Sequence, residues 1–354
     1  MFESIAKTNT THTNSSGDTR SRWKTFVACQ KARIEAEKDE SVLFLCYNAL
    51  LAKYLRQLFD KESETNPKIK NIQVDTIDGF TCRWFRTLEP YYDKLYADLD
   101  RHPEKFVYQN VIVDEAQDFG KDGINGCGDG SENSSGILSI LKVLMSLKDG
   151  DYYVFYDKDQ LVNNERTPEV LIDPDCKITL YKNCRNTKAI ASTSLSSINP
   201  DLKDNTVKSA LPGETPQFIY TTKEKESEAL DKLLATLPLS KETVTILTPY
   251  METTPLEHED DAYIFQGKKI PFFTCRRFKG LESDIIILVD VDKSEFTDDD
   301  RNFYVGSSRA KFNLTVLTTM TKEDCKEILR KRGKPVPPNS NTQLLLAKSM
   351  YAKI

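Results

Sequence analysis

Short, unbroken apolar runs are the feature that most constrains the fold of this chain. Segments such as IIILVD at 285–290 and VIVD at 111–114 contain no polar residue before their final aspartate. Strands of this kind are typical of a parallel sheet that helices cover on both faces. Stretches with the 3.6-residue period of an amphipathic helix stand between them. We therefore predict an α/β fold with mainly parallel sheets.

The same patterns predict the elements and the domains. Strands are expected at 41–46, 72–77, 111–114, 152–156, 178–181, 217–221, 244–247, 285–290 and 314–317, and helices at 49–58, 137–147, 187–198, 224–237 and 322–332. The glycine- and serine-rich segment 120–136 predicts a surface loop. A break near residue 170 divides a first domain, 23–170, from a second, 171–335. Residues 1–22 are expected to be irregular, and 336–354 to form a C-terminal tail.

Composition excludes several classes of protein. The 354 residues are 39% hydrophobic and 29% charged, which is ordinary for a soluble two-domain protein. No apolar run reaches the roughly 18 residues of a membrane span, and no signal-peptide core follows the first residues, so we expect no membrane insertion and an intracellular location, in the cytoplasm or a nucleus. The eight scattered cysteines and three histidines predict reduced thiols and no histidine-based metal centre.

The net charge of −5 argues against a protein that coats nucleic acid without specificity. It is compatible with a local basic cleft. Basic clusters occur at 276–279, 309–311 and 330–334, and the last of these also has the simpler interpretation of a solvated helix end.

The segment VIVDEAQDF at 111–119 is the strongest signal for chemistry. An apolar strand that ends in Asp-Glu is how a phosphate-binding α/β domain presents carboxylates at the edge of its sheet. Asp114 would hold Mg²⁺, and Glu115 would accept a proton from an attacking water. Alone, such a pair is common and often structural.

Four later segments strengthen this interpretation. Gln160 follows the strand YYVFY, within reach of a γ-phosphate at a neighbouring strand end. Arg185 precedes a helix, Glu282 lies in a turn before a strand, and Arg309 lies on a helix that leads into a strand. Two separated arginines from the second half of the chain suit charge stabilisation of a phosphoryl transition state. Each arginine taken singly is more often a surface charge or half of a salt bridge.

The ordered series DEAQD, DKDQ, NCRNT, RFKGLE and YVGSSRA is similar to motifs II to VI of the superfamily 1 helicases of the UvrD/Rep type. LFLCYNALLAKYL at 43–55 resembles motif Ia, and VDTIDGFTCRWF at 74–85 resembles motif Ib. The resemblance covers about residues 23–318. It implies two RecA-like domains of the P-loop NTPase type, ATP and Mg²⁺ as cofactors, and single-stranded DNA as the partner, with RNA left open.

The resemblance also implies roles for single residues. The γ-phosphate would be sensed by Gln160 and stabilised by Arg185 and Arg309 as arginine fingers, while Gly280 and Glu282 would contact the nucleotide. The DNA strand would be touched by Tyr47, Asn48, Thr76, Phe80 and Arg277. Aromatic residues there suit base stacking without sequence preference. For Phe80 and Trp84 the alternative is a place in the core.

The phosphate-binding loop departs from the family pattern. Lys24 and Thr25 match the end of the Walker A motif, and Thr25 would be the second ligand of Mg²⁺, but Asp18 and Trp23 replace both glycines of G-x-x-x-x-G-K-[ST]. Those glycines let backbone N–H groups curl around phosphate. Residues 1–17 contain no apolar strand, and no glutamine motif precedes the loop. Either the segment before residue 23 reflects a truncated or misassigned reading frame, or the nucleotide site has been lost.

Three functions are therefore open. The first is an ATP-dependent DNA helicase or translocase with a lean core, because the segments between its motifs are short. The second is a catalytically impaired helicase-like module that binds nucleic acid or a protein partner. The third, which rests on analogy alone, is a defence or DNA-repair component whose nuclease lies on another chain.

Overall fold

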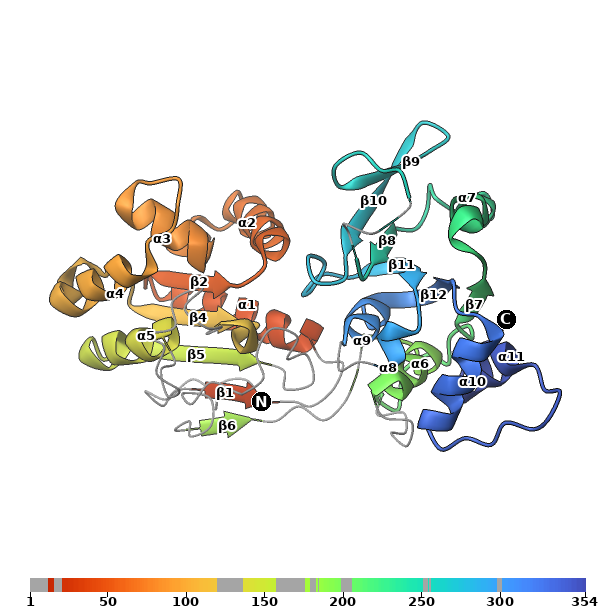
Figure 1. The fold of residues 1–354 in the computed structure, drawn as a ribbon. Coiled ribbons are helices and arrows are strands. Elements are labelled where there is room, and N and C mark those ends of the chain that lie inside the picture. The colour runs from red at the N-terminus through yellow and green to blue at the C-terminus, as the bar shows by residue number, and fades with distance from the viewer. Residues whose placement is uncertain are drawn as a thin grey trace. The chain divides into compact units, whose positions relative to one another are not determined.

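The computed structural model describes residues 12–15, 21–119, 136–156, 176–178, 183, 185–198, 206–250, 254, 256–297 and 301–354. The chain forms two compact units, Met1–Tyr181 and Lys182–Ile354. The predicted boundary near residue 170 is too early, because β6 (Cys176–Ile178) still pairs with β1 (His12–Ser15) of the first unit. The predicted α/β class is confirmed in both units (Figure 1).

The described part of the first unit contains a six-stranded sheet with the order β3-β2-β4-β5-β1-β6, and each recorded pairing is parallel. The remaining strands are β2 (Val42–Cys46), β3 (Ile72–Thr76), β4 (Asn110–Asp114) and β5 (Asp151–Tyr156). The helices are α1 (Ser21–Glu37), α2 (Ala49–Ser63), α3 (Ile77–Phe85), α4 (Tyr92–Arg101) and α5 (Gly136–Leu147), with 3₁₀ turns at Pro67–Asn71, Pro103–Lys105 and Ala116–Asp118.

Helices cover both faces of this sheet, as the unbroken apolar strands predict. Alternate residues of a strand point to opposite faces. Leu43 and Leu45 of β2 pack in one core with residues of α3, α4 and α5. Phe44, between them, has its ring 6.3 Å from that of Phe59 on α2, on the other face. Polar side chains that belong to the covered strands can therefore reach water at the strand ends.

Strand β1 corrects the expectation that the N-terminal residues form no strand. Its sequence is HTNS, and its main chain pairs in parallel with β5 on one side and β6 on the other. A segment without apolar residues gives no hydrophobic pattern, so this strand is invisible to periodicity. Main-chain hydrogen bonds to two neighbours supply the stabilisation instead. Helix α1 also begins at Ser21, so the expectation of an irregular segment 1–22 is wrong for these residues.

The second unit also has a six-stranded sheet in its described part, with the order β7-β12-β11-β8-β10-β9. The strands are β7 (Gln217–Tyr220), β8 (Val244–Thr248), β9 (Ala262–Phe265), β10 (Lys268–Thr274), β11 (Ser283–Val291) and β12 (Ala310–Thr318). The recorded pairings between these strands are parallel except that of β9 with β10. This hairpin, which the sequence patterns did not predict, turns at Gln266 and Gly267, both with positive φ (48° and 75°).

The helices of the second unit are α6 (Lys188–Ile198), α7 (Glu226–Leu234), α8 (Ser294–Thr297), α9 (Asn302–Ser307), α10 (Lys322–Lys331) and α11 (Thr342–Ser349), with a 3₁₀ turn at Lys223–Lys225. The expected C-terminal tail is part of this unit. Helix α11 packs on α10, and the amide of Phe218 donates to the carbonyl of Lys353 at 2.7 Å, which adds the chain end to the edge of β7. Main-chain pairing of this kind leaves no mark in side-chain composition.

No helix in the described residues is both long and apolar enough to cross a membrane.

Gly306 of α9 marks a close approach between this helix and the sheet. A Cβ atom there would lie 2.6 Å from the Sγ of Cys275 and 2.8 Å from a methyl carbon of Leu288. Both distances are shorter than real contacts, so a side chain at this position requires the side chains of Cys275 and Leu288, or the helix itself, to shift.

We predict that Gly306→Ala lowers the free energy of unfolding of the second unit by about 1–3 kcal/mol, because it overpacks a buried contact. Urea unfolding of the full chain measures it. Cys275→Ala removes the nearest atom, so the double variant should recover part of the loss, and simple additivity of the two changes would contradict the packing explanation.

Candidate nucleotide site and nucleic-acid interface

Two adjacent carboxylates lie at the carboxyl end of β4. Asp114 is the last residue of the strand, flanked by β2 and β5, and its side chain is fully buried. Glu115 follows with φ of 55°, a left-handed conformation that is uncommon for a residue other than glycine. Its amide donates to Oδ1 of Asp114 at 3.0 Å, and Nε2 of Gln117 donates to its Oε2 at 2.5 Å. A strained backbone with buried acids is typical of functional sites.

Helix α1 brings the Lys24–Thr25 pair to these carboxylates. The hydroxyl of Thr25 donates to Oδ2 of Asp114 at 2.5 Å, across 89 positions of sequence. Lys24 is fully buried, and its positive charge acts on Asp114. The structure therefore brings together the Lys24–Thr25 pair and the Asp114–Glu115 pair, which the sequence motifs identified separately. Asp18 and Gln160 lie outside the described residues, and of Trp23 only the backbone, within α1, is described.

The pKa of Asp114 is raised from its ordinary value to about 7. Burial is the main cause, the neighbouring charge of Glu115 adds to it, and Thr25 and Lys24 oppose it. Burial and the neighbouring acid disfavour the ionised carboxylate. A cation bound beside it would favour the ionised form and so stabilise the site.

The residues present fit a magnesium ion held together with a phosphate. Mg²⁺ takes hard oxygen ligands and is usually bound through one or two protein groups, with water and substrate phosphates completing the octahedron. Thr25 and Asp114 supply such a pair of oxygens. Among the described residues no group of three histidines, cysteines or acids gathers.

The backbone just before Lys24 departs from the motif. Ser21–Trp23 already belong to helix α1, where the motif has a glycine loop that curls around phosphate. The side chain of Lys24 is buried, and its charge acts on Asp114.

In the second unit, a row of charged side chains lies at the amino ends of β11 and β12. Nε of Arg185 is 3.4 Å from Oε2 of Glu282, and Lys311 pairs with both Glu282 and Asp284. The Lys311 hydrogen bond lowers the pKa of Asp284 to about 2. Gly280 precedes this row with φ of 83°, a conformation that favours glycine.

Arg309 is fully buried beside this row. Its Nε donates to the carbonyl of Val305 at 2.8 Å and its Nη2 to the hydroxyl of Ser308 at 3.1 Å. Nη1 of Arg185 donates to the carbonyl of Ser308, so both arginines predicted as fingers converge on one turn.

Two asparagines that sequence reasoning did not single out hold this arrangement together. Oδ1 of Asn183 accepts from the amides of Arg185 and Asn186. Nδ2 of Asn186 donates to the carbonyls of Ser308 and Ala310, at 3.0 and 2.5 Å. The Asn-x-Arg-Asn spacing in the sequence could have identified these two residues, because asparagine side chains commonly bond local backbone groups.

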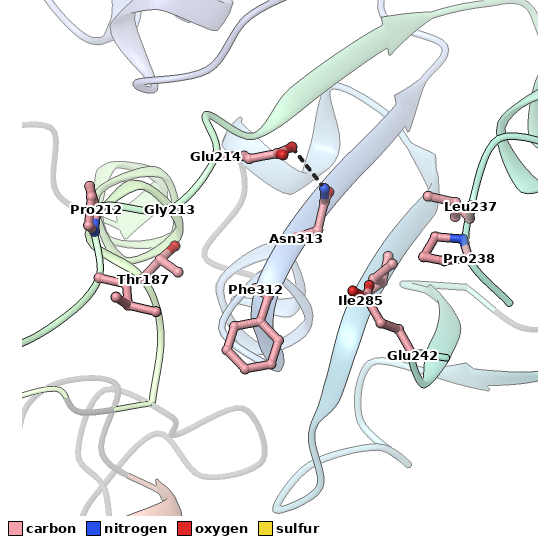
Figure 2. Close-up of a pocket in the computed structure, with 11 residues that line it drawn as sticks. Thr187, Pro212, Gly213, Glu214, Leu237, Pro238, Glu242, Ile285, Phe312 and Asn313 are labelled. Atoms are coloured by element: carbon pink, nitrogen blue, oxygen red, sulfur yellow. Dashed lines mark hydrogen bonds between the residues drawn. The ribbon is translucent and has the colours of Figure 1, made fainter. Parts of the chain in front are cut away.

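A cavity of about 530 Å³ opens beside this row, at the amino ends of the same strands. Figure 2 shows the ring of Phe312 between Thr187 on one side and Ile285 on the other, with Asn313 donating to Glu214 at 3.3 Å. The Phe312 side chain is half exposed.

The predicted DNA-contacting residues of the first unit lie at the carboxyl edge of its sheet. Thr76 and Asp114 both pair with Cys46 in the sheet register, and Tyr47 and Asn48 follow directly. Asn48 accepts from the amides of Leu50 and Leu51 as the N-cap of α2, and Thr76 caps α3 by accepting from the amide of Gly79. Both side chains thus have helix-capping tasks. Tyr47 is partly buried, edge-on to Phe119 at 6.1 Å.

Phe80 does not lie where it could stack on a base. It is only 2% exposed, and its ring contacts those of Trp84, Phe106 and Tyr108. The core alternative is therefore the correct one, because α3 turns this face toward α4 and the sheet. Trp84 is partly buried against the same core, and its Nε1 donates to Asp98 at 2.8 Å.

Arg277 lies in the turn after β10 and is about half exposed. Its guanidinium pairs with Asp261 and lies over the ring of Phe273.

No protein-family model matches this chain, and no curated protein matches it. Solved structures that are similar to it include arterivirus nonstructural protein 10, a helicase, at 13% identity and a TM-score of 0.42, over 87% of this chain and 59% of that one. Mss116p bound to single-stranded RNA and AMP-PNP is similar at 10% identity and a TM-score of 0.49, over 99% of this chain and 76% of that one. The C-terminal domain of a possible DNA helicase from Lactobacillus plantarum is similar at 16% identity and a TM-score of 0.29, over 38% and 86%. This chain thus spans about 59% of the length of the arterivirus helicase.

The raised pKa of Asp114 predicts how stability depends on pH. An acid that is harder to ionise when folded contributes stability that is complete below its unfolded value, near 3.8, and is lost as the pH rises to about 7. Relative to Asp114→Asn, the melting temperature of the unaltered chain should therefore fall between pH 4 and 7.

Asp284→Asn is the matched control, because the lowered pKa of Asp284 keeps that acid ionised throughout this range. Its difference from the unaltered chain should be nearly constant between pH 4 and 7, with a small change only near pH 4, where the unfolded chain begins to protonate this acid. A constant difference for Asp114→Asn as well would show that its carboxylate is not disfavoured by burial.

We predict that Phe80→Ala lowers the free energy of unfolding by about 3–5 kcal/mol, since it empties an aromatic core position. Phe80→Leu keeps most of the apolar volume and should retain the affinity for single-stranded DNA of the unaltered chain, as measured by fluorescence anisotropy. If the Phe80→Leu variant is folded but has lost affinity for single-stranded DNA, Phe80 does stack on a base and the core assignment is contradicted.

Proposed function

We propose that this chain is a nucleoside-triphosphate-driven helicase or translocase of the UvrD/Rep type, built on two RecA-like units and acting on single-stranded nucleic acid, with DNA as the expected strand. The observation that carries the proposal is the hydrogen bond between Thr25 and Asp114. It unites a Lys-Thr pair at a helix start with a carboxylate at a parallel strand end, which is the pairing that P-loop NTPases use for Mg²⁺.

In this proposal each residue of the first unit has one task. Thr25 and Asp114 hold Mg²⁺, which with ATP supplies charge neutralisation on the phosphates. Lys24 offsets phosphate charge. Glu115 accepts the proton of the attacking water, and Gln117, bonded to its Oε2, orients that carboxylate. Gln160 is proposed as the γ-phosphate sensor.

Arg185, Arg309 and Glu282 are proposed to serve the same nucleotide from the second unit. Arg185 is buried and held by Glu282 and the Ser308 carbonyl, so its position is set in advance. Preorganised charge of this kind stabilises a phosphoryl transition state without a reorganisation cost. The nucleic acid is proposed to follow Tyr47, Asn48 and Thr76 in the first unit and Arg277 in the second.

A second candidate is a helicase-like binding module that does not hydrolyse nucleotide. The observation that favours it is the helical backbone of Ser21–Trp23, just before Lys24, where a glycine loop would curl around phosphate. Trp23 in place of the second glycine agrees with it.

For the motor, we predict that Glu115→Gln reduces DNA-stimulated ATP hydrolysis by about 100-fold or more, because a general base contributes at least that much. Affinity for a single-stranded oligonucleotide should be retained. Glu62→Gln is the matched control and should leave hydrolysis unchanged. It removes a partly buried acid of α2 that pairs with Arg33 of α1.

Binding of ATP separates the two candidates. The motor requires ATP to bind and be hydrolysed by this chain, or by a variant with the loop restored by Asp18→Gly and Trp23→Gly. If neither protein hydrolyses ATP while both bind single-stranded DNA with an affinity that ATP does not change, the binding module is the correct function.

A further inference from the structure

An arginine that the nucleic-acid proposal needs lies in the turn after β10 of the second unit. Nη1 of Arg277 lies 2.6 Å from Oδ1 of Asp261, and Nη2 lies 3.1 Å from Oδ2. Both nitrogens of the guanidinium edge are thus engaged by both oxygens of one carboxylate. The two side chains are about half exposed, 48% and 44%.

Beneath this pair lies a partly exposed aromatic ring. The Arg277 guanidinium carbon is 5.6 Å from the ring centre of Phe273. Phe273 in turn stacks on Phe278, with ring centres 5.7 Å apart and planes 18° from parallel. Phe278 is buried, so it supports Phe273 from the interior. While Arg277 lies over Phe273, it occupies space that a planar base would need.

The two partners of the ion pair are held independently. The carbonyl of Asp261 accepts from the amide of Phe272, which fixes the acid to β10. The amide of Arg277 donates to the hydroxyl of Thr274 at 3.0 Å, which fixes the following turn. An exposed ion pair contributes little to stability. Its two side chains can therefore separate without unfolding either segment.

We propose that Asp261 is an internal competitor for phosphate, which holds Arg277 over Phe273 until single-stranded nucleic acid replaces it. A guanidinium binds a carboxylate and a phosphate through the same two-pronged geometry, so the exchange conserves the hydrogen bonds of Arg277. A backbone phosphate takes Arg277, and a base stacks on the uncovered Phe273 without sequence preference. The inference rests on the proposed nucleic-acid function and adds Phe273 and Asp261 to its binding surface.

The test is the affinity of the full chain, without nucleotide, for an oligo-dT strand, measured by fluorescence anisotropy. Asp261→Asn removes the competing charge and should tighten binding by roughly threefold to tenfold. Phe273→Ala should weaken it, because the base loses its stacking partner. Melting temperatures confirm that each variant is folded.

Glu259→Gln is the matched control. It removes one negative charge from the same hairpin, but Glu259 pairs with Lys269, at 3.8 Å, and not with Arg277. It should tighten binding clearly less than Asp261→Asn does. In an Arg277→Ala background, Asp261 has lost the arginine with which it pairs. Asp261→Asn and Glu259→Gln should then change the affinity for oligo-dT equally.

Equal effects of the two acid variants in the unaltered background would mean that only general charge matters, and the inference would be overturned. Unchanged affinity on Phe273→Ala would overturn the stacking part. If the unaltered chain and all variants fail to bind oligo-dT, the proposed nucleic-acid function itself is wrong, and the inference falls with it.

Discussion

The hydrogen bond between Thr25 and Asp114 joins the first helix of the chain to the end of a strand 89 positions away. It is possible because β1, β4 and β5 run parallel, so that the chain leaves each of them at the same edge of the sheet. The catalytic tasks proposed for the first unit depend on this edge. Glu115 is held there in a left-handed backbone, and Lys24 is brought there by the packing of α1 on β4 and β5.

Charge is treated differently in the two units. In the first, Asp114 and Glu115 are buried side by side, and the hydroxyl of Thr25 and the charge of Lys24 only partly offset the rise in the pKa of Asp114. In the second, acids and bases alternate in space, and Lys311 keeps the pKa of Asp284 low. A cation that reaches the first arrangement would stabilise its carboxylates, whereas in the second the acids and bases already pair with one another.

Periodicity located the strands and helices with strong apolar patterns to within a few residues, because burial on a sheet face leaves a direct record in side-chain type. It failed at β1, whose four polar residues are held by main-chain hydrogen bonds, and at the C-terminal segment that pairs with β7. It also left Phe80 ambiguous. An aromatic residue on a helix has the same pattern whether that face meets a core or a base, and only the position of α3 against α4 decides.

The sequence by itself determined the α/β class, the identity of the paired carboxylates and the order of the motif segments, since these are properties of local residue type and spacing. Tertiary structure alone decided which of those residues meet. Thr25 donates a hydrogen bond to Asp114, and Arg277 pairs with Asp261. Arg185 and Arg309 both bond to Ser308. Such contacts join positions far apart in the chain, and they exist only once strand order and register are set.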